Sequence, residues 1–240
     1  MNFKTLSSRA RSYWMPLLLL PIIFFRAPLY GDGCVAPPPG LVAWWPLEGN
    51  ATDLAANHTG TIVGAVSPIP AEVGLGLALE DVPSGISVPD ATDLNFGPGA
   101  DFSIEAWVRP ETASTSYDVM NIVDKRLVTS DSSAVGYELY LGGGRIAFEI
   151  SDSPFKGVQL VGLTGPDLRD GSWHHVAVTV HRASTTGGNL YVDGALISTF
   201  DPTGNQGDLS NSQPLLIGLH PSYPRLNCNF KGGIDEVSHL

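Results

Sequence analysis

Apolar and polar residues alternate along most of the chain after residue 40. In the segment 102–109 every even position is apolar, and in 176–180 every even position is a valine. Successive side chains of a β-strand point to opposite faces of a sheet, so this pattern predicts strands with one buried face. Further apolar runs predict strands at 40–47, 59–66, 75–80, 85–89, 121–126, 137–141, 145–151, 158–163, 189–192, 195–200, 214–219 and 232–238.

Turn signals separate these runs. Three consecutive glycines at 142–144 predict a hairpin loop, and Asp193-Gly194 between two apolar runs predicts a tight hairpin. No long segment combines a helical period with capping residues, so we expect almost no helix in the domain. About a dozen short strands in one chain of this length predict an all-β fold, with two antiparallel sheets packed face to face.

The first residues have the features of an export signal. Lys4, Arg9 and Arg11 precede the apolar run 14–25. That run is shorter than the roughly 20 residues that a membrane-spanning helix needs, and it fits the apolar part of a signal peptide. We therefore predict a signal peptide at 1–31, a proline-rich linker at 32–39 and one domain at 40–240, with no transmembrane segment. The style of the signal suggests a secreted or cell-surface protein of a bacterium.

The charge of the chain limits its partners. The formal net charge is −11, and the export segment is basic, so the remainder is more acidic still. Such a surface argues against nucleic acids and anionic membranes as partners. It favours solubility and is compatible with a bound cation.

Six motifs, in the order and at the approximate spacing that the family shows, resemble the laminin-G-like jelly-roll domains of the concanavalin A-like lectin/glucanase family. They are GLVAWWPLEGNATD at 40–53, SIEAWVRP at 103–110, IVDKR at 122–126, GSWHHVAV at 171–178, LYVDG at 190–194 and FKGGIDEV at 230–237. The resemblance implies a two-sheet antiparallel concanavalin A-like jelly-roll sandwich, in which the first and last strands are neighbours. Members of the family often carry a tail beyond the last motif, so the chain is expected to be truncated at its C-terminal end.

The same resemblance implies a calcium site. Asp53 follows the first strand and Asp235 lies in the last, so their carboxylates would converge if those strands are neighbours. Glu48 and Asn57 are further oxygen ligands of the kind that calcium takes. The chain departs from the family at 56–59, where His58 stands at a position commonly filled by Asn. A plain turn role for the same residues is the alternative.

The chain has two cysteines, Cys34 and Cys228. An even number in an exported protein predicts a disulfide bond. The pairing requires the linker at 37–39 to fold back along the sheet, and two unpaired thiols are the alternative.

Aromatic residues are assigned from the same pattern. Trp107 and Trp173 are expected in the core, because they fall in strongly alternating strands, where a large apolar side chain buries much area. Trp44 and Trp45 are neighbours on one strand and point to opposite faces, so only one of them is expected in the core. Candidate ligand contacts are one of these two together with Tyr117, Tyr140 and Tyr223.

Enzyme motifs are absent from the sequence. Glycosidases need two carboxylates beside the scissile bond, and a catalytic strand would carry them two or four residues apart on one face. No Glu-x-Asp-x-x-Glu pattern occurs, and neither do serine-hydrolase, zinc-protease or nucleotide-loop motifs. We predict a non-catalytic binding or adhesion module for a carbohydrate or an extracellular protein surface. A structural spacer is the first alternative, and a divergent glycosidase or lyase is the second.

Overall fold

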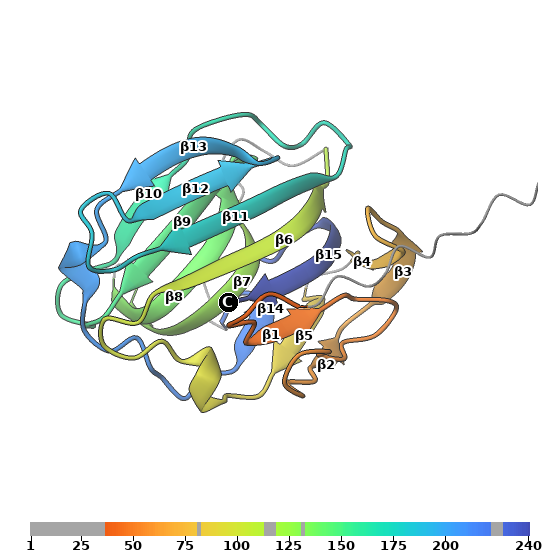
Figure 1. Ribbon diagram of the computed structural model, residues 1–240. Helices are drawn as coiled ribbons and strands as arrows, with labels where there is room; N and C mark the ends of the chain where they lie inside the picture. Colours follow the sequence, from red (N-terminus) through yellow and green to blue (C-terminus); the bar gives the residue numbers. More distant parts are fainter. Residues whose placement is uncertain (1–36, 81–82, 113–118, 131–132, 222–227) are drawn as a thin grey trace, which may run out of the picture. The chain divides into compact units, whose positions relative to one another are not determined.

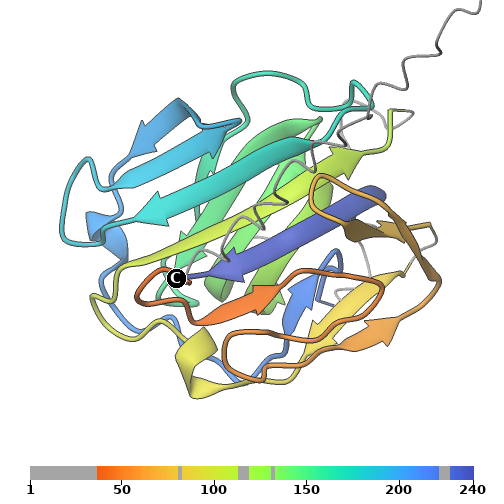
Figure 2. The same cartoon turned by 45° about the vertical axis from the view of Figure 1, so that its right-hand side comes forward.

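Two antiparallel sheets contain the strands of the structure, which is a computed structural model that describes residues 37–80, 83–112, 119–130, 133–221 and 228–240. The first sheet has eight strands. Its spatial order is β13 (Ala195–Phe200), β12 (Gly188–Val192), β11 (His174–Val180), β6 (Phe102–Pro110), β15 (Gly232–His239), β4 (Leu75–Leu79) and β3 (Val66–Pro70), and β1 (Ala43–Trp45) also pairs with β15. Figure 2 shows β15, in dark blue, between the yellow-green β6 and the orange β1.

The second sheet has seven strands and lies behind the first in Figure 1. Its spatial order is β10 (Gln159–Gly162), β9 (Arg145–Ser151), β8 (Ser133–Gly142), β7 (Val119–Ser130), β14 (Leu215–Ile217), β5 (Gly85–Val88) and β2 (Thr61–Val63). The only helices in the described ranges are two short 3-10 turns, η1 (Thr92–Leu94) and η2 (Thr203–Asn205). The predicted all-β sandwich of two antiparallel sheets is confirmed.

The core lies between the two sheets, as the alternating pattern requires. On β6, Ile104, Ala106 and Val108 are fully buried, and they belong to the same hydrophobic cluster as Leu139 of β8 and Phe148 of β9. On β6, β8 and β9 one face therefore points into the core and the other points away from it. The outer face of the seven-stranded sheet is the one that matters for function below.

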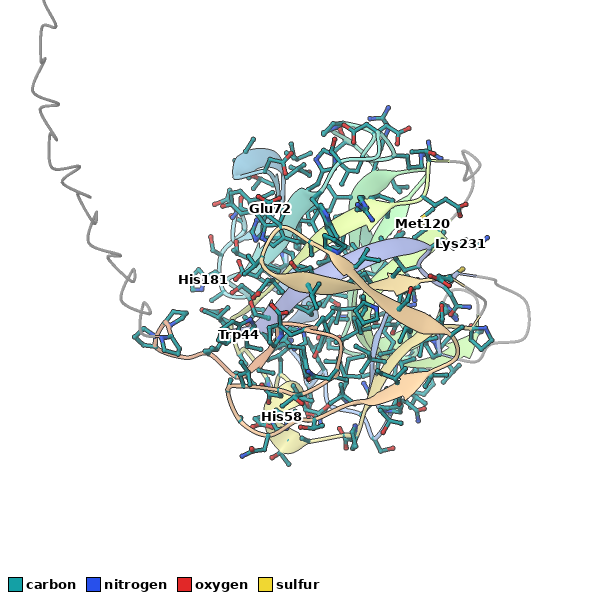
Figure 3. All side chains as sticks on the ribbon, turned by 90° about the vertical axis from the view of Figure 1, so that its right-hand side faces the viewer. Trp44, His58, Glu72, Met120, His181 and Lys231 are labelled. Carbon is teal, nitrogen blue, oxygen red and sulfur yellow. The ribbon has the colours of Figure 1, made fainter. Side chains whose placement is uncertain are left out.

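The N- and C-terminal strands of the domain are neighbours, as the resemblance implied. β1 pairs antiparallel with β15, and Trp44 lies opposite Ser238. Trp45 is fully buried and donates its indole N–H to the carbonyl of His58 at 2.8 Å, whereas Trp44 is half-buried. Trp44 and His58, which come from β1 and the loop after it, are labelled in Figure 3.

The prediction that Trp107 and Trp173 are core residues is wrong. Trp107 occupies an odd position of β6, so it points away from Ile104, Ala106 and Val108 and is only half-buried. Its ring contacts the ring of His175 on the outer face, with centroids 5.3 Å apart. Trp173 is also half-buried, and the guanidinium of Arg109 lies over it. The alternation that places the even positions inside also places Trp107 outside.

One strand was missed in the sequence. β3 contains Pro68 and Pro70, and prolines are weak signals for a strand because they cannot donate to the ladder. β3 is at the edge of its sheet and pairs only with β4, where a missing donor is tolerated.

In the part of the chain that the structure describes, no helix has the length and hydropathy of a membrane span. The predicted signal peptide and most of the predicted linker lie outside the described residues, so both segments stay predictions.

Candidate functional site

A row of acidic side chains crosses the outer face of the seven-stranded sheet. Asp124 of β7 lies directly opposite Glu138 of β8, and Glu138 lies directly opposite Glu149 of β9. Leu139 and Phe148, the neighbours of the two glutamates along their strands, belong to the core. The three carboxylates therefore lie side by side on the outer face, although each belongs to a different strand.

Arg126 holds these three carboxylates together. It lies two residues after Asp124 on the same strand, so both side chains are on the same face. Its Nη2 donates to Asp124 Oδ2 at 2.6 Å, and its Nη1 lies 2.7 Å from Glu138 Oε2 and 2.6 Å from Glu149 Oε2. Asp124 also accepts the side-chain amide of Asn121 at 2.9 Å. One guanidinium thus compensates three acids that are largely removed from water.

Burial changes the pKa values of Glu138 and Glu149. Glu138 is 2% exposed, and burial, together with the charges of Asp124 and Glu149, raises its pKa well above its usual value. Its second oxygen, Oε1, is buried and has no hydrogen-bond partner among the described residues. Burial also raises the pKa of Glu149, although less. Burial lowers the pKa of Arg126, but the acids around it outweigh that effect and raise it, so the guanidinium stays charged.

The network forms part of the lining of a pocket of about 650 Å³, a size within the roughly 300–1,000 Å³ typical of small-molecule sites. Arg126, Glu138, Glu149 and Tyr140 line it, and the Tyr140 hydroxyl lies 3.5 Å from Glu149 Oε1. The walls are largely apolar and consist of Val119, Val128, Val158, Leu160 and Leu163. Asp167 and Arg169, which form an ion pair, contribute further polar groups together with Arg145. Such a pocket can take a ligand that has both hydrogen-bonding groups and apolar surface.

Cys228 also lines this pocket. It is buried, and burial raises the pKa of its thiol to about 11. Its predicted disulfide partner, Cys34, lies outside the described residues, so the disulfide stays a prediction.

Asp53, the first predicted calcium ligand, braces the loop after β1. Its Oδ1 accepts the backbone N–H groups of Trp44 and Ala55, both at 2.8 Å. Its Oδ2 accepts those of Ala56 at 3.1 Å and His58 at 2.7 Å. Burial raises the pKa of Asp53, but the four backbone donors outweigh it and lower the pKa below its usual value. These contacts fit the turn role that was the alternative to calcium.

Asp235 and Glu48 are organised by a different turn. Asp235 Oδ2 accepts the N–H of Val73 at 3.2 Å, and Glu48 Oε2 accepts that of Leu75 at 3.1 Å. Asp235 is fully buried, its Oδ1 has no partner among the described residues, and burial together with Glu236 and Glu48 raises its pKa to about 6.

Asn57, the fourth predicted ligand, is exposed in a left-handed backbone conformation. Among the described residues, no group of three or more His, Cys, Asp or Glu side chains could hold a metal ion. Calcium would therefore rely on backbone carbonyls and water beside these carboxylates, and it stays a prediction.

The aromatic residues predicted to contact a ligand lie in different places. Tyr140 lines the pocket. Trp44 lies in the other sheet, where its indole N–H donates to Glu236 at 2.5 Å. Tyr117 and Tyr223 lie outside the described residues.

The carboxylate row itself was missed in the sequence. A search for paired carboxylates two or four residues apart on one strand cannot find a set that is assembled across three strands. The signal that was available is the presence of charged residues within strands that are rich in apolar residues: Asp124 and Arg126 on β7, Glu138 on β8 and Glu149 on β9. Only the strand register brings them together.

The fold and the pocket can be compared with those of known proteins. The sequence model of the Concanavalin A-like lectin/glucanases superfamily matches residues 83–239, and the chain belongs to this superfamily. A search of curated protein sequences gave no match.

Solved structures with this fold include several binding domains. The binding domain of Paraclostridial Mosquitocidal Protein 1 has a TM-score of 0.66 at 18% identity, over 83% of this chain and 48% of that one. The binding domain of Botulinum Neurotoxin serotype G has a TM-score of 0.62 at 16% identity, over 83% and 47%. This chain thus spans about half the length of either toxin domain.

A third similar structure matches over nearly its whole length. It is domain 4 of AbnA, a GH43 extracellular arabinanase from Geobacillus stearothermophilus, in complex with arabinotriose. Its TM-score is 0.56 at 18% identity, over 83% of this chain and 91% of that one. At these identities, the three structures establish a shared fold.

Proposed function

We propose that the chain is a non-catalytic binding module that holds a neutral oligosaccharide in the pocket over Arg126, Glu138 and Glu149. The observation that carries the proposal is the charged network in a pocket with apolar walls. Sugar hydroxyls donate to carboxylates and accept from guanidinium and phenol groups, while the C–H faces of the rings contact apolar side chains. The pocket contains both kinds of surface.

The balance of charge favours a neutral ligand. Arg126, Arg145 and Arg169 line the pocket with guanidinium groups, and Glu138, Glu149 and Asp167 line it with carboxyl groups. Burial raises the pKa of Glu138 well above its usual value. A strongly charged ligand would therefore meet groups of its own sign as well as groups of the opposite sign.

Similar structures lend support to this proposal. Domain 4 of AbnA was solved with arabinotriose, and it matches this chain over most of its length. The two toxin neighbours are themselves named as binding domains, although the chain spans only half of each. The predicted signal peptide fits the same proposal, because extracellular glycans are reached by exported proteins.

Hydrolysis is the second candidate, because Glu138 and Glu149 resemble the paired carboxylates of glycosidases and the acid of such a pair has a raised pKa. Their positions argue against it. A general acid must present its proton to the leaving oxygen, but Glu138 has Oε1 buried and Oε2 against Arg126. Glu149 has one oxygen on the same Arg126 nitrogen. The pair is better placed to organise donors and acceptors than to react.

The test uses a panel of neutral oligosaccharides, with arabinotriose included, and isothermal titration calorimetry on wild type and variants. Glu149→Gln is the pocket variant, because Glu149 retains some exposure and the change preserves its shape. Glu72→Gln is the matched control, in the exposed turn between β3 and β4 of the other sheet and labelled in Figure 3.

Binding that Glu149→Gln weakens and Glu72→Gln leaves unchanged is the expected result. Binding that neither variant affects would place the ligand elsewhere, and the absence of binding to any glycan would favour a structural spacer. Product analysis of the same mixtures covers hydrolysis, since any shortened oligosaccharide would contradict a non-catalytic role.

A further inference from the structure

Phe155 is the most exposed large apolar residue among those that the structure describes, at 95%. It lies in the loop between β9 and β10. Single exposed apolar residues are common on protein surfaces, so exposure alone means little. Phe155 differs because its loop is fixed on several sides and adjoins the pocket.

Hydrogen bonds anchor this loop to two parts of the domain. Asp152 accepts the N–H of Gly207 at 2.6 Å, and the ammonium group of Lys156 donates to the carbonyl of Gly204 at 2.5 Å, so the loop is tied to the segment around η2. Asp152 and Lys156 also form an ion pair with each other. On the other side, Ser133 of β8 donates its hydroxyl to the carbonyl of Pro154.

Local contacts shape the tip of the loop as well. The N–H of Phe155 donates to the hydroxyl of Ser153 at 3.2 Å, and the hydroxyl of Ser151 donates to the carbonyl of Ser153 at 2.9 Å. The backbone around Phe155 is therefore held on both sides of an aromatic ring that remains exposed. Such an arrangement reduces the entropy that the loop would lose on binding a ligand.

The loop adjoins the pocket at two points. Ser133, which holds Pro154, is the neighbour of the pocket-lining Ala134. After the loop, the chain continues directly into Val158 and Leu160, which belong to the apolar wall. Leu160 is 48% exposed, so apolar surface continues from the wall toward the loop.

We propose that Phe155 is a stacking platform for a sugar unit of an oligosaccharide that extends out of the pocket. This inference rests on the proposed function and adds an outer subsite to it. The face of a phenyl ring carries partial negative charge, and the C–H groups of a sugar ring carry partial positive charge, so the two stack favourably. A protein partner fits less well, because stable interfaces bury about 800 Å² on each side, whereas Phe155 is the only large apolar side chain exposed in this loop.

The test is the dependence of affinity on chain length. Dimers to hexamers of arabino-, xylo-, gluco- and manno-oligosaccharides are titrated by calorimetry into wild type, Phe155→Ala and Phe155→Trp. Phe155→Ala should weaken binding of the longer oligomers by about three- to tenfold and leave the shortest ligand that binds unchanged. Phe155→Trp should retain the affinity of wild type. Leu196→Ala, at an exposed apolar position on β13 of the other sheet, should have no effect.

The outcomes separate this inference from the proposed function. If Glu149→Gln weakens binding of all lengths but Phe155→Ala weakens none, the outer subsite is wrong and the pocket stands. If Phe155→Ala changes only self-association in sedimentation experiments, the residue serves a contact between proteins, and the inference is also wrong. If no oligomer binds wild type, both proposals fail.

Discussion

Glu138 and Glu149 lie directly opposite each other on β8 and β9, and one oxygen of each lies within 2.7 Å of the same Arg126 nitrogen. Asp124 completes the set from β7. Three acids around one guanidinium are costly to remove from water, and replacing such buried ionic groups by apolar residues of similar volume is often neutral or stabilising. Because these groups line a pocket, we attribute the arrangement to ligand binding and not to stability.

Arg126 should be essential for stability. Arg126→Met would leave Asp124, Glu138 and Glu149 without their shared cation, and breaking a buried ion pair typically costs about 3–5 kcal/mol of unfolding free energy. Arg109→Met is the control, because Arg109 lies over Trp173 on the other sheet and its loss should cost only about 1 kcal/mol. Urea denaturation measures both values. Equal losses for the two variants would contradict the role given to Arg126.

Glu138 and Glu105, which lie on different sheets, should contribute to the free energy of unfolding with opposite dependence on pH. Burial raises the pKa of Glu138, so its protonated form is favoured in the folded state and its contribution to stability is lost as pH rises. Glu138→Gln removes that titration, and its stability relative to wild type should therefore increase from pH 4 to pH 8, measured by urea denaturation.

Glu105 on β6 provides the matched comparison. His175 and Ser238 lower the pKa of Glu105 by hydrogen bonding, so its contribution to stability is present near neutral pH and is lost as pH falls. Glu105→Gln should therefore lose stability relative to wild type as pH rises over the same range. Parallel pH profiles for the two variants would show that the burial of Glu138 does not control its ionisation.

Much of the fold, and little of the site, was predictable from the sequence. Strict alternation in β6 and β11 fixes which side chains enter the core, because the side-chain period of a strand is two. The same rule, applied fully, would have placed Trp107 on the outer face. The site depends instead on the register between β7, β8 and β9, and a one-residue slip of β8 would turn Glu138 into the core. Local patterns do not determine such register between strands.

Calcium can be tested by its effect on stability. An ion that binds only the folded protein raises the melting temperature, so chelator should lower it if the site forms at Asp53, Asp235, Glu48 and Asn57. Asp235→Asn should remove the response. Because protonation competes with the cation and the pKa of Asp235 is raised to about 6, the response should be larger at pH 8 than at pH 5. A melting curve unaffected by chelator at pH 8 would exclude the site.

The predicted disulfide between Cys34 and Cys228 can be tested by alkylation and mass spectrometry of the intact protein. Burial and a raised thiol pKa would slow alkylation of Cys228 in the folded protein even without a disulfide, so alkylation must be carried out in denaturant. We expect no alkylation before reduction and two alkylated thiols afterwards. Two alkylated thiols without reductant would contradict the disulfide.

The most direct test of the central claim is a crystal structure of the protein with the tightest-binding oligosaccharide of the panel. The account predicts a sugar ring against Arg126, Glu149 and Tyr140, with the chain leaving the pocket past Leu160. A sugar bound instead to the outer face of the eight-stranded sheet, beside Trp107 and Trp173, would contradict it.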